Sequence, residues 1–308
     1  MFINPYQHLE TDAFPMRTNF HMHAGTGRNT CGHHPIPRVL RAYQEAHYDI
    51  LCISNHNILT NPKLYRWRTK MLLVPGFEFT RKTHIVCIGT KRKYSKEGDQ
   101  QKAIDESVAN GGFSIIAHPN WLRDWFVPEA DFDLFKNYIG IEIINGSMEY
   151  AQSAKKEREN RSYAGDVYDV LLSKGKLLWA FGNDDFHRWN SFANAWNMIY
   201  CEKTFASMCD AVKKGAFYAS SGVQLRYLKL EGDTVKIACR AAEYFIEPMR
   251  YRFIGYKGEI LKEEYAVEGT YALRGDEKYV RVEVTDTVGN MLYTNPIYDD
   301  EFFQKRSE

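Results

Sequence analysis

The sequence predicts an α/β protein, in which a parallel barrel of strands and helices precedes a small antiparallel β domain. Between residues 17 and 222, short apolar runs alternate with longer segments whose apolar residues recur every three or four positions. This pattern is typical of strands that alternate with amphipathic helices. After Gly222 the helical periodicity fades, and strands with alternating residues are separated by glycine-containing turns. We therefore expect a barrel domain at residues 1–222 and a β-sandwich-like domain at residues 223–308.

The elements of the first domain follow from these runs. Eight short apolar segments are predicted to be strands, at residues 18–23, 49–54, 71–74, 84–89, 113–117, 139–144, 177–181 and 217–220. Four amphipathic segments between them are predicted to be helices, at residues 37–47, 101–110, 163–174 and 205–214. Strand–helix alternation of this kind, repeated over about 200 residues, is typical of a parallel α/β barrel.

The predicted β domain contains strands at residues 224–230, 235–241, 251–256 and 278–285. The clearest alternation is Tyr-Val-Arg-Val-Glu-Val at residues 279–284. Alternation with period two is typical of a strand with one buried face. We expect these strands to form a small antiparallel sandwich.

Composition excludes some classes of protein. The chain has 308 residues, of which 44% are hydrophobic, so it can bury a large core. Its net charge is +1 and no basic or acidic block occurs, which favours neither a nucleic-acid nor a membrane partner. Six scattered cysteines without a C-x-x-C pair indicate reduced thiols. Without a signal sequence or a transmembrane-length apolar run, we expect a cytoplasmic protein with a small-molecule substrate.

The first predicted strand ends in Phe-His-Met-His, at residues 20–23. Alternate residues of a strand share one face, so His21 and His23 point the same way. Two interpretations are open for this pair alone: metal ligands at a strand end, or polar residues on the solvent face of an amphipathic strand.

More ligand-type side chains follow other predicted strands: His56, Glu78, His118, Asp185 and His187. In a parallel barrel the carboxyl ends of all strands open onto one face, so these side chains would converge. His84 begins its strand, and it can reach that face only if the strand is antiparallel or irregular. Imidazoles and carboxylates together favour Zn, Mn or Fe(II). Their number exceeds the needs of one ion, so we expect two or three ions bridged by Glu78.

The order and spacing of five motifs resemble the PHP (polymerase and histidinol phosphatase) superfamily of metallohydrolases. These motifs are H-x-H at 21–23, N-H-N at 55–57, P-G-x-E at 75–78, A-H-P at 117–119 and D-x-H at 185–187. The tail, with R-V-E-V-T-D at 281–286 and T-N-P-I at 294–297, resembles the branch that includes carbaryl-hydrolase-like members. The resemblance implies a distorted (β/α)7 TIM-like barrel and a site for two or three metal ions.

The resemblance also implies how the ligands divide among the ions. One ion would be held by His21, His23, Glu78 and Asp185. A second would be held by Glu78, His84 and His118. A third would be held by His56, His187 and a residue of the loop after His23.

Two departures from the family pattern affect this site. The loop after His23 contains Thr-Cys-Gly at residues 30–32, where the family usually has S-D-G. Either Cys31, as a thiolate, or His33 would then supply the missing ligand. Asn55 replaces the usual Asp before His56, and an amide can donate a hydrogen bond but cannot neutralise a cation.

The predicted chemistry is hydrolysis. Divalent ions lower the pKa of a bridging water to roughly 7, which supplies hydroxide for attack on phosphorus or on a carbonyl carbon. The candidate catalytic residues are His118, His187 and Asp185, with either histidine as the proton donor to the leaving group. Side chains beyond strand ends are candidates for substrate binding: Arg28, Asn57, Asn120, Arg123, Asn145 and Arg188.

The leading hypothesis is a metal-dependent phosphoesterase that acts on a small phosphorylated metabolite or nucleotide. An amide or carbamate hydrolase that uses the same site is the alternative, and a non-catalytic metal-dependent binding module is the alternative of another class. The substrate, the native metal, the oligomeric state and the role of the β domain stay open.

Overall fold

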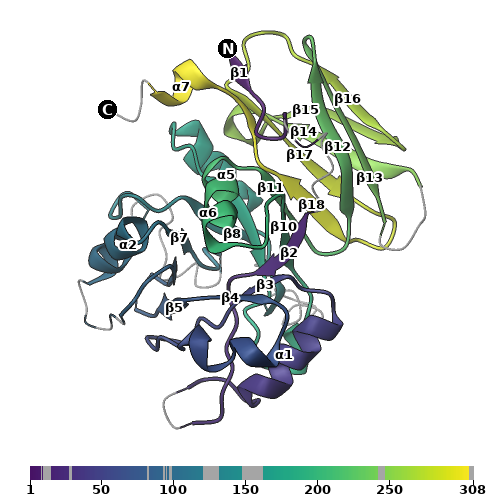
Figure 1. Cartoon of the computed structure of the whole chain (residues 1–308). Helices are drawn as coiled ribbons and strands as arrows, with labels where there is room; N and C mark the ends of the chain where they lie inside the picture. The colour runs from purple at the N-terminus through teal and green to yellow at the C-terminus, as the bar shows by residue number, and fades with distance from the viewer. Residues whose placement is uncertain are drawn as a thin grey trace.

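The computed structural model describes residues 1–7, 9, 15–27, 30–81, 83–92, 94, 96, 99–120, 132–147, 162–241 and 247–304. This part of the chain contains nineteen strands in three sheets and five α-helices. Figure 1 shows the C-terminal strands at one end of the molecule and helix α1 (Ile36–Glu45) at the other. No helix in these ranges is long and apolar enough to cross a membrane.

The largest sheet has eleven strands. Nine of them follow one another in the order β1 (Phe2–Ile3), β19 (Ile297–Asp299), β17 (Tyr279–Thr285), β18 (Met291–Thr294), β11 (Phe217–Ser220), β10 (Trp196–Ile199), β2 (Met16–Asn19), β3 (Ile50–Cys52) and β4 (Leu72–Val74). The other two are β14 (Met249–Ile254), which pairs with β17, and β15 (Ile260–Ala266), which pairs with β14. The ladders from β2 to β3 and from β3 to β4 are parallel, and the others are antiparallel.

The second sheet has five strands in chain order: β5 (Gly76–Phe79), β6 (Ile85–Ile88), β7 (Phe113–Ile116), β8 (Gly140–Asn145) and β9 (Trp179–Asn183). Its first two ladders are antiparallel, and the ladders β7–β8 and β8–β9 are parallel. Helix α2 (Gln100–Ala109) connects β6 to β7, and α5 (Gly165–Ser173) precedes β9. Helix α6 (Phe205–Lys213) lies between β10 and β11 in the chain, and α7 (Asp300–Gln304) follows β19.

The predicted (β/α)7 barrel is wrong, although most of the predicted strands and helices occur where expected. The strands divide between separate mixed sheets, and several neighbours predicted to be parallel are antiparallel. The link from β5 to β6 explains one of these differences, because it comprises only residues 80–84. A parallel pair needs a crossover of about a dozen residues or more, so this link permits only an antiparallel pair. Strands β5 and β10 were also absent from the prediction.

The chain passes from the first sheet to the second at Pro75, between β4 and β5. Proline has no N–H to donate to a ladder, which favours a break in pairing there. The next residue, Gly76, has no room for a side chain, since a Cβ would lie 2.7 Å from the Cys52 Sγ and from the Cys87 carbonyl oxygen. Two isolated parallel bridges also connect the two sheets among the described residues: His56 pairs with Glu78, and Met22 pairs with Phe186.

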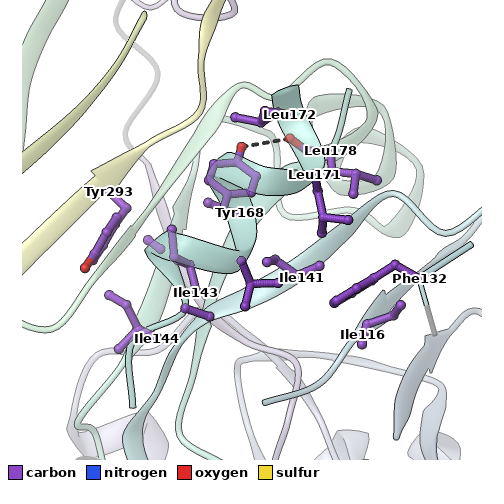
Figure 2. Packing of buried hydrophobic residues seen from close by; sticks show 14 of the residues in the cluster. Ile116, Phe132, Ile141, Ile143, Ile144, Tyr168, Leu171, Leu172, Leu178 and Tyr293 are labelled. Atoms are coloured by element: carbon purple, nitrogen blue, oxygen red, sulfur yellow. Dashed lines mark hydrogen bonds between the residues drawn. The ribbon is translucent and has the colours of Figure 1, made fainter. Parts of the chain in front are cut away.

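Helix α5 packs on β8 through apolar side chains, as Figure 2 shows. The labelled residues are Ile116, Phe132, Ile141, Ile143, Ile144, Tyr168, Leu171, Leu172, Leu178 and Tyr293. Tyr168 in the helix donates a hydrogen bond of 2.7 Å to the Leu178 carbonyl oxygen. Full burial of one such side chain contributes roughly 1.5–3 kcal/mol, so this interface fixes β8 in place beside the predicted site.

The predicted tail strands are confirmed as antiparallel elements. Strands β12 (Gln224–Glu231), β13 (Thr234–Arg240) and β16 (Gly269–Ala272) form a three-stranded sheet, and its apolar face packs in one cluster with side chains of β14 and β17. Strand β18 nevertheless pairs with β11, so one hydrogen-bonded sheet crosses residue 222. The domain division at residues 222 and 223 stays a prediction.

Candidate metal centre

The segment after β2 carries the first two histidines into the interior. Strand β2 ends at Asn19, so His21 and His23 lie in extended chain just beyond the strand, and both are fully buried. The His23 N–H donates to the Phe186 carbonyl oxygen (2.7 Å), and the Asp185 N–H donates to the His21 carbonyl oxygen (2.9 Å). The solvent-face interpretation of this histidine pair is therefore wrong.

Four buried ligand atoms converge without satisfying one another. His21 Nε2 lies 3.4 Å from Glu78 Oε2 and 3.3 Å from Asp185 Oδ1. His23 Nε2 lies 3.4 Å and 3.1 Å from the same two oxygens. Apart from charge contacts of 2.5 Å between His56 Nδ1 and Glu78 Oε2 and of 3.4 Å between His187 Nδ1 and Asp185 Oδ1, these four atoms have no hydrogen-bond partner among the described residues. We call this set the inner group.

Glu78 connects the inner group to a second pair of histidines. Its Oε1 atom lies 2.7 Å from His84 Nδ1 and 3.3 Å from His118 Nε2. His84 reaches this point because β6 runs antiparallel to β5, which places the start of β6 beside the end of β5. The two carboxylate oxygens of Glu78 thus face different sets of imidazoles.

Electrostatics around Glu78 favour its ionised form. Burial alone would raise its pKa, but His21, His118 and His56 hold it well below the ordinary value. Burial likewise opposes the charged form of His21, yet Glu142, Asp185 and Glu78 raise the pKa of His21 well above its usual range. The carboxylates and the imidazoles stabilise one another's charges here. A bound cation would stabilise the carboxylates in the same way.

Two of the predicted ligands occupy strained backbone positions. His118 has φ 30° and Asp185 has φ 47°, in the left-handed region that residues other than glycine rarely adopt. The His118 N–H donates to Glu142 Oε2 at 2.8 Å, which helps to hold this conformation. Strain of this kind concentrates at functional sites and costs about 1–3 kcal/mol per residue.

A second set of ligand atoms lies on the solvent side of the inner group. One ligand atom from each of His23, Cys31, His56 and His187 lies within 4.8 Å of the others. Cys31 and His56 are partly exposed, and so is His187. Burial would raise the pKa of Cys31, but hydrogen bonds with His187, His23 and His56 lower it to about 4.

His33, the alternative loop ligand, does not belong to any group of possible metal ligands found among the described residues. Its side chain is exposed. The next residue, His34, stacks on Trp189 with ring centroids 4.7 Å apart. The structure therefore brings Cys31, and not His33, next to the predicted ligands.

Asn55 has a structural contact that explains the absence of the usual Asp. Its Oδ1 accepts a hydrogen bond from the Ala24 N–H (3.0 Å), and its Nδ2 donates to the Ala24 carbonyl oxygen (2.9 Å). The amide is buried and also donates to Thr60 Oγ1 at 3.2 Å. A carboxylate lacks the N–H donor that two of these contacts require.

Two buried carboxylates near the site were missed in the sequence. Glu142 accepts from His21 Nδ1 (2.7 Å) and from the His118 N–H, so it orients two ligands. Asp184 accepts from the Tyr43 hydroxyl (2.7 Å) and from three successive backbone N–H groups at residues 193–195. The only signal for Glu142 was a single charge inside the apolar run Gly-Ile-Glu-Ile-Ile at residues 140–144.

The predicted substrate-binding residues have varied surroundings. Asn145 donates to Glu142 Oε2 (3.1 Å) and Asp185 Oδ2 (3.3 Å), so it supports a ligand. Asn120 is buried and donates to the Tyr163 carbonyl oxygen and to Asp166. Asn57 accepts from the Thr80 N–H, next to His56, and Arg188 is exposed. Arg28 and Arg123 lie outside the described residues.

Comparison with known protein families and with curated proteins found no match for this chain. The resemblance to the PHP superfamily thus stays a prediction. The geometry itself establishes a narrower point: buried clusters of histidine, glutamate and aspartate side chains could hold a metal ion.

Proposed function

We propose that this protein is a metal-dependent hydrolase whose centre takes two or three divalent ions, chosen from Zn, Mn and Fe. The observation that carries the proposal is the inner group, with its four buried ligand atoms that have no hydrogen-bond partner among the described residues. A buried polar atom without a hydrogen-bond partner costs about 1–3 kcal/mol, and here the charge contacts between the carboxylates and imidazoles offset only part of that cost. A bound cation would remove this cost by accepting lone pairs from all four atoms.

The ligands divide in a way that suits more than one ion. One ion would contact His21, His23, Glu78 and Asp185, and a second would contact the other Glu78 oxygen with His84 and His118. Ions in these positions would supply hydroxide at neutral pH by lowering the pKa of a bound water. Glu142 would hold His21 in the tautomer that presents Nε2, because its carboxylate accepts the proton on Nδ1.

His187 is placed to protonate the leaving group when only these two positions are filled. Its side chain is 29% exposed, whereas that of His118 is 6% exposed and lies against Glu78. Asp185 faces His21 and His23, so we assign it a ligand role and not a proton-transfer role. An exposed imidazole next to the ions can exchange its proton with solvent between turnovers.

We favour a small phosphorylated metabolite or nucleotide as substrate. Two ions about 3.5–4 Å apart stabilise both the attacking and the leaving oxygen of an in-line displacement, which suits a phosphoester. Exposed Arg188 directly follows the D-x-H motif and would provide a guanidinium for phosphate. An amide or carbamate substrate is the second candidate, because the C-terminal strands carry the motifs that resemble carbaryl-hydrolase-like proteins.

A substrate panel tests this proposal. Purified protein loaded with Mn, Zn or Fe(II) would be incubated with nucleotides, sugar phosphates and aryl carbamates, beside the variant Glu78→Gln. We expect phosphate release by the wild type and a loss of at least about 100-fold in the variant, because Glu78 contacts both predicted ions. Turnover of carbamates alone would replace the phosphoesterase by the second candidate.

Metal content separates the hydrolase from the binding module. We expect two or more ions per chain by elemental analysis after supplementation and desalting. Ions bound without turnover of any substrate would favour a non-catalytic metal-dependent binding module. Fewer than one ion per chain would contradict the metal centre itself.

A further inference from the structure

We propose that residues 62–70 form a surface that binds an anionic phospholipid membrane, with Leu64 and Trp67 at the boundary between the headgroups and the acyl chains. We call these residues the Trp67 segment. They contain two short 3-10 helices, η1 (Pro62–Leu64) and η2 (Arg66–Arg68), and lie between β3 and β4 in the chain. None of them is a predicted metal ligand, so this inference does not rest on the proposed function.

The Trp67 segment carries a local excess of positive charge. Its basic side chains are all exposed: Lys63, Arg66, Arg68 and Lys70. No acidic residue occurs between Asp49 and Glu78. Helix α1 adds exposed Arg41, and the one acidic residue of that helix is Glu45. Clusters of about four or more basic residues are typical of segments that bind anionic lipids. The whole-chain charge of +1 hides this cluster, because acidic residues elsewhere balance it.

Two large apolar side chains of the same segment are exposed to solvent. Leu64 is 62% exposed and Trp67 is 71% exposed. They are close to each other, because the Trp67 indole N–H donates to the Leu64 carbonyl oxygen at 3.1 Å. Neighbouring exposed apolar side chains among cations are typical of a segment that lies in a membrane interface, where tryptophan is also enriched. The segment therefore combines electrostatic attraction with apolar area that a membrane can bury.

The contacts of Trp67 favour a lipid surface over single-stranded nucleic acid, the other anionic partner that exposed aromatic and basic residues bind. The one N–H of the indole is already bonded within the segment, so the ring can leave water without an unpaired donor. The Arg68 Cζ atom lies 4.0 Å from the ring centroid and covers one face of the ring. Nucleic-acid surfaces of this kind present aromatic faces on which bases stack, and Leu64 offers none.

The Trp67 segment is held against α1, so its surface exists before a membrane binds. Gln44 Oε1, on α1, accepts from the Thr69 hydroxyl (2.8 Å) and from the Lys70 N–H (2.7 Å). Tyr65 packs against the apolar cluster that contains the buried side of α1. Figure 1 shows α1 at the end of the molecule opposite the C-terminal strands, so a membrane at this end would not meet them.

Vesicle sedimentation with the whole chain tests this proposal. The protein would be mixed with vesicles of phosphatidylcholine alone, or of phosphatidylcholine and phosphatidylglycerol in equal parts. We expect binding to the anionic vesicles that weakens as salt is added, and binding to the neutral vesicles that is at least about tenfold weaker. Equal binding to both kinds of vesicle, or binding to neither, would overturn the proposal.

Charge reversal separates this surface from the rest of the molecule. The double variant Arg66→Glu with Arg68→Glu should lose at least about tenfold in affinity for anionic vesicles, because two cations become two anions. The matched control is Arg226→Glu with Arg274→Glu, which changes the net charge equally at exposed positions near the C-terminal strands. We expect the control to retain most of its affinity. Equal losses in the two double variants would show that net charge alone governs binding, against the proposal.

Tryptophan fluorescence tests whether the ring itself enters the membrane. The emission of the wild type should shift to shorter wavelength when anionic vesicles are added. Trp67→Phe should bind nearly as well and lose this shift, whereas Trp67→Ser should also bind more weakly. Tyr265→Ser, at an aromatic position that is also 71% exposed, is the control and should behave as the wild type does. A shift that persists in Trp67→Phe would place a different tryptophan at the membrane and overturn the proposal.

Two further measurements separate this inference from its alternatives. Fluorescence anisotropy would measure binding to a labelled single-stranded oligonucleotide. Oligonucleotide binding that is lost in the double variant of Arg66 and Arg68, without binding to vesicles, would assign the surface to nucleic acid and overturn the membrane proposal. Elemental analysis of the same preparations reports on the metal centre. Vesicle binding by a protein that takes up no metal would leave this inference standing while the proposed function fails.

Discussion

At the scale of a single residue, Glu142 holds two of the predicted metal ligands in place, although no ion is proposed to contact it. It accepts hydrogen bonds from His21 Nδ1 and from the His118 N–H, while Asn145 and Asn183 donate to it. Four donors thus share one buried carboxylate. Its charge and its two acceptor oxygens position two ligands that come from distant parts of the chain.

Glu142→Gln should weaken metal binding by about 10–100-fold, because the amide nitrogen would face a donor, either on His21 or on His118. Competitive titration with a chromophoric chelator would measure this affinity, and circular dichroism would verify the fold. Glu231→Gln, at an exposed position of β12, is the control and should bind metal as the wild type does. Equal affinities in the two variants would contradict the orienting role.

Asn55→Asp should destabilise this protein by about 1–3 kcal/mol. The carboxylate would lose the N–H donor to the Ala24 carbonyl oxygen and would place one oxygen against another. Urea unfolding would measure the change. Asn61→Asp is the matched control: the Asn61 side chain only accepts a bond, from the Lys63 N–H, and aspartate caps a helix equally well. Equal stabilities would contradict the structural role of Asn55.

The sequence alone predicted most of the candidate metal ligands, but not the residues that hold those ligands in place. His21, His23, Glu78, His118 and Asp185 lie at or after the ends of predicted strands, and this pattern was sufficient to group them. Glu142 lies inside a strand, so no spacing rule separates it from a chance charge. The choice between Cys31 and His33 depended on how the loop closes at Gly25 and Gly32, which composition does not reveal.

At the scale of elements, a buried ion pair joins helix α5 to strand β17. Arg281 is fully buried, and its guanidinium donates to both Asp169 oxygens at 2.6 Å and to Glu283 Oε1 at 2.8 Å. Planar bidentate pairs of this kind have a fixed geometry. The contact fixes the C-terminal strands against the helix that packs on β8.

Arg281→Met should destabilise the protein by about 3–5 kcal/mol, because it leaves buried Asp169 without its cation and leaves Glu283 only the more distant Arg252, at 3.9 Å. Guanidinium chloride unfolding would measure the difference. Arg252→Met is the matched control: it removes the half-buried pair with Glu263 and a longer contact of 3.9 Å with Glu283, and we expect a loss of less than about 1 kcal/mol. A loss at Arg281 no larger than that at Arg252 would show that the buried pair contributes little.

The sequence also predicted the elements better than their connections. Strand β11 and helix α6 were placed within one residue of their observed bounds. The barrel prediction failed because alternation was taken to mean parallel pairing. Strand β5 was not predicted, so neither the short link at residues 80–84 nor the switch between sheets at Pro75 could be recognised in the sequence. Pairing is a long-range property, and local patterns constrain it weakly.

At the scale of the whole molecule, metal binding should be linked to folding. The inner group collects ligands from β5 and from the segments that follow β2 and β9, so an unfolded chain cannot present them together. A ligand that binds only the native state stabilises it by about 2.7 kcal/mol at a concentration of 100 Kd. We expect Zn(II) to raise the midpoint of thermal unfolding and a chelator to lower it. Magnesium, which prefers oxygen ligands, is the control and should have a smaller effect.

The pairing of β11 with β18 determines whether a fragment of residues 1–222 can stay monomeric. Without the later strands, the N–H and C=O groups that β11 directs at Leu292, Tyr293 and Thr294 become an open sheet edge. Strand β11 is apolar and buried, and an exposed edge of that kind recruits other chains. A fragment of residues 1–222 should therefore aggregate, as light scattering after size exclusion would show. A fragment that stays monomeric and binds metal would show that β18 is not needed to prevent aggregation. The C-terminal strands would then have a role other than covering the edge of β11.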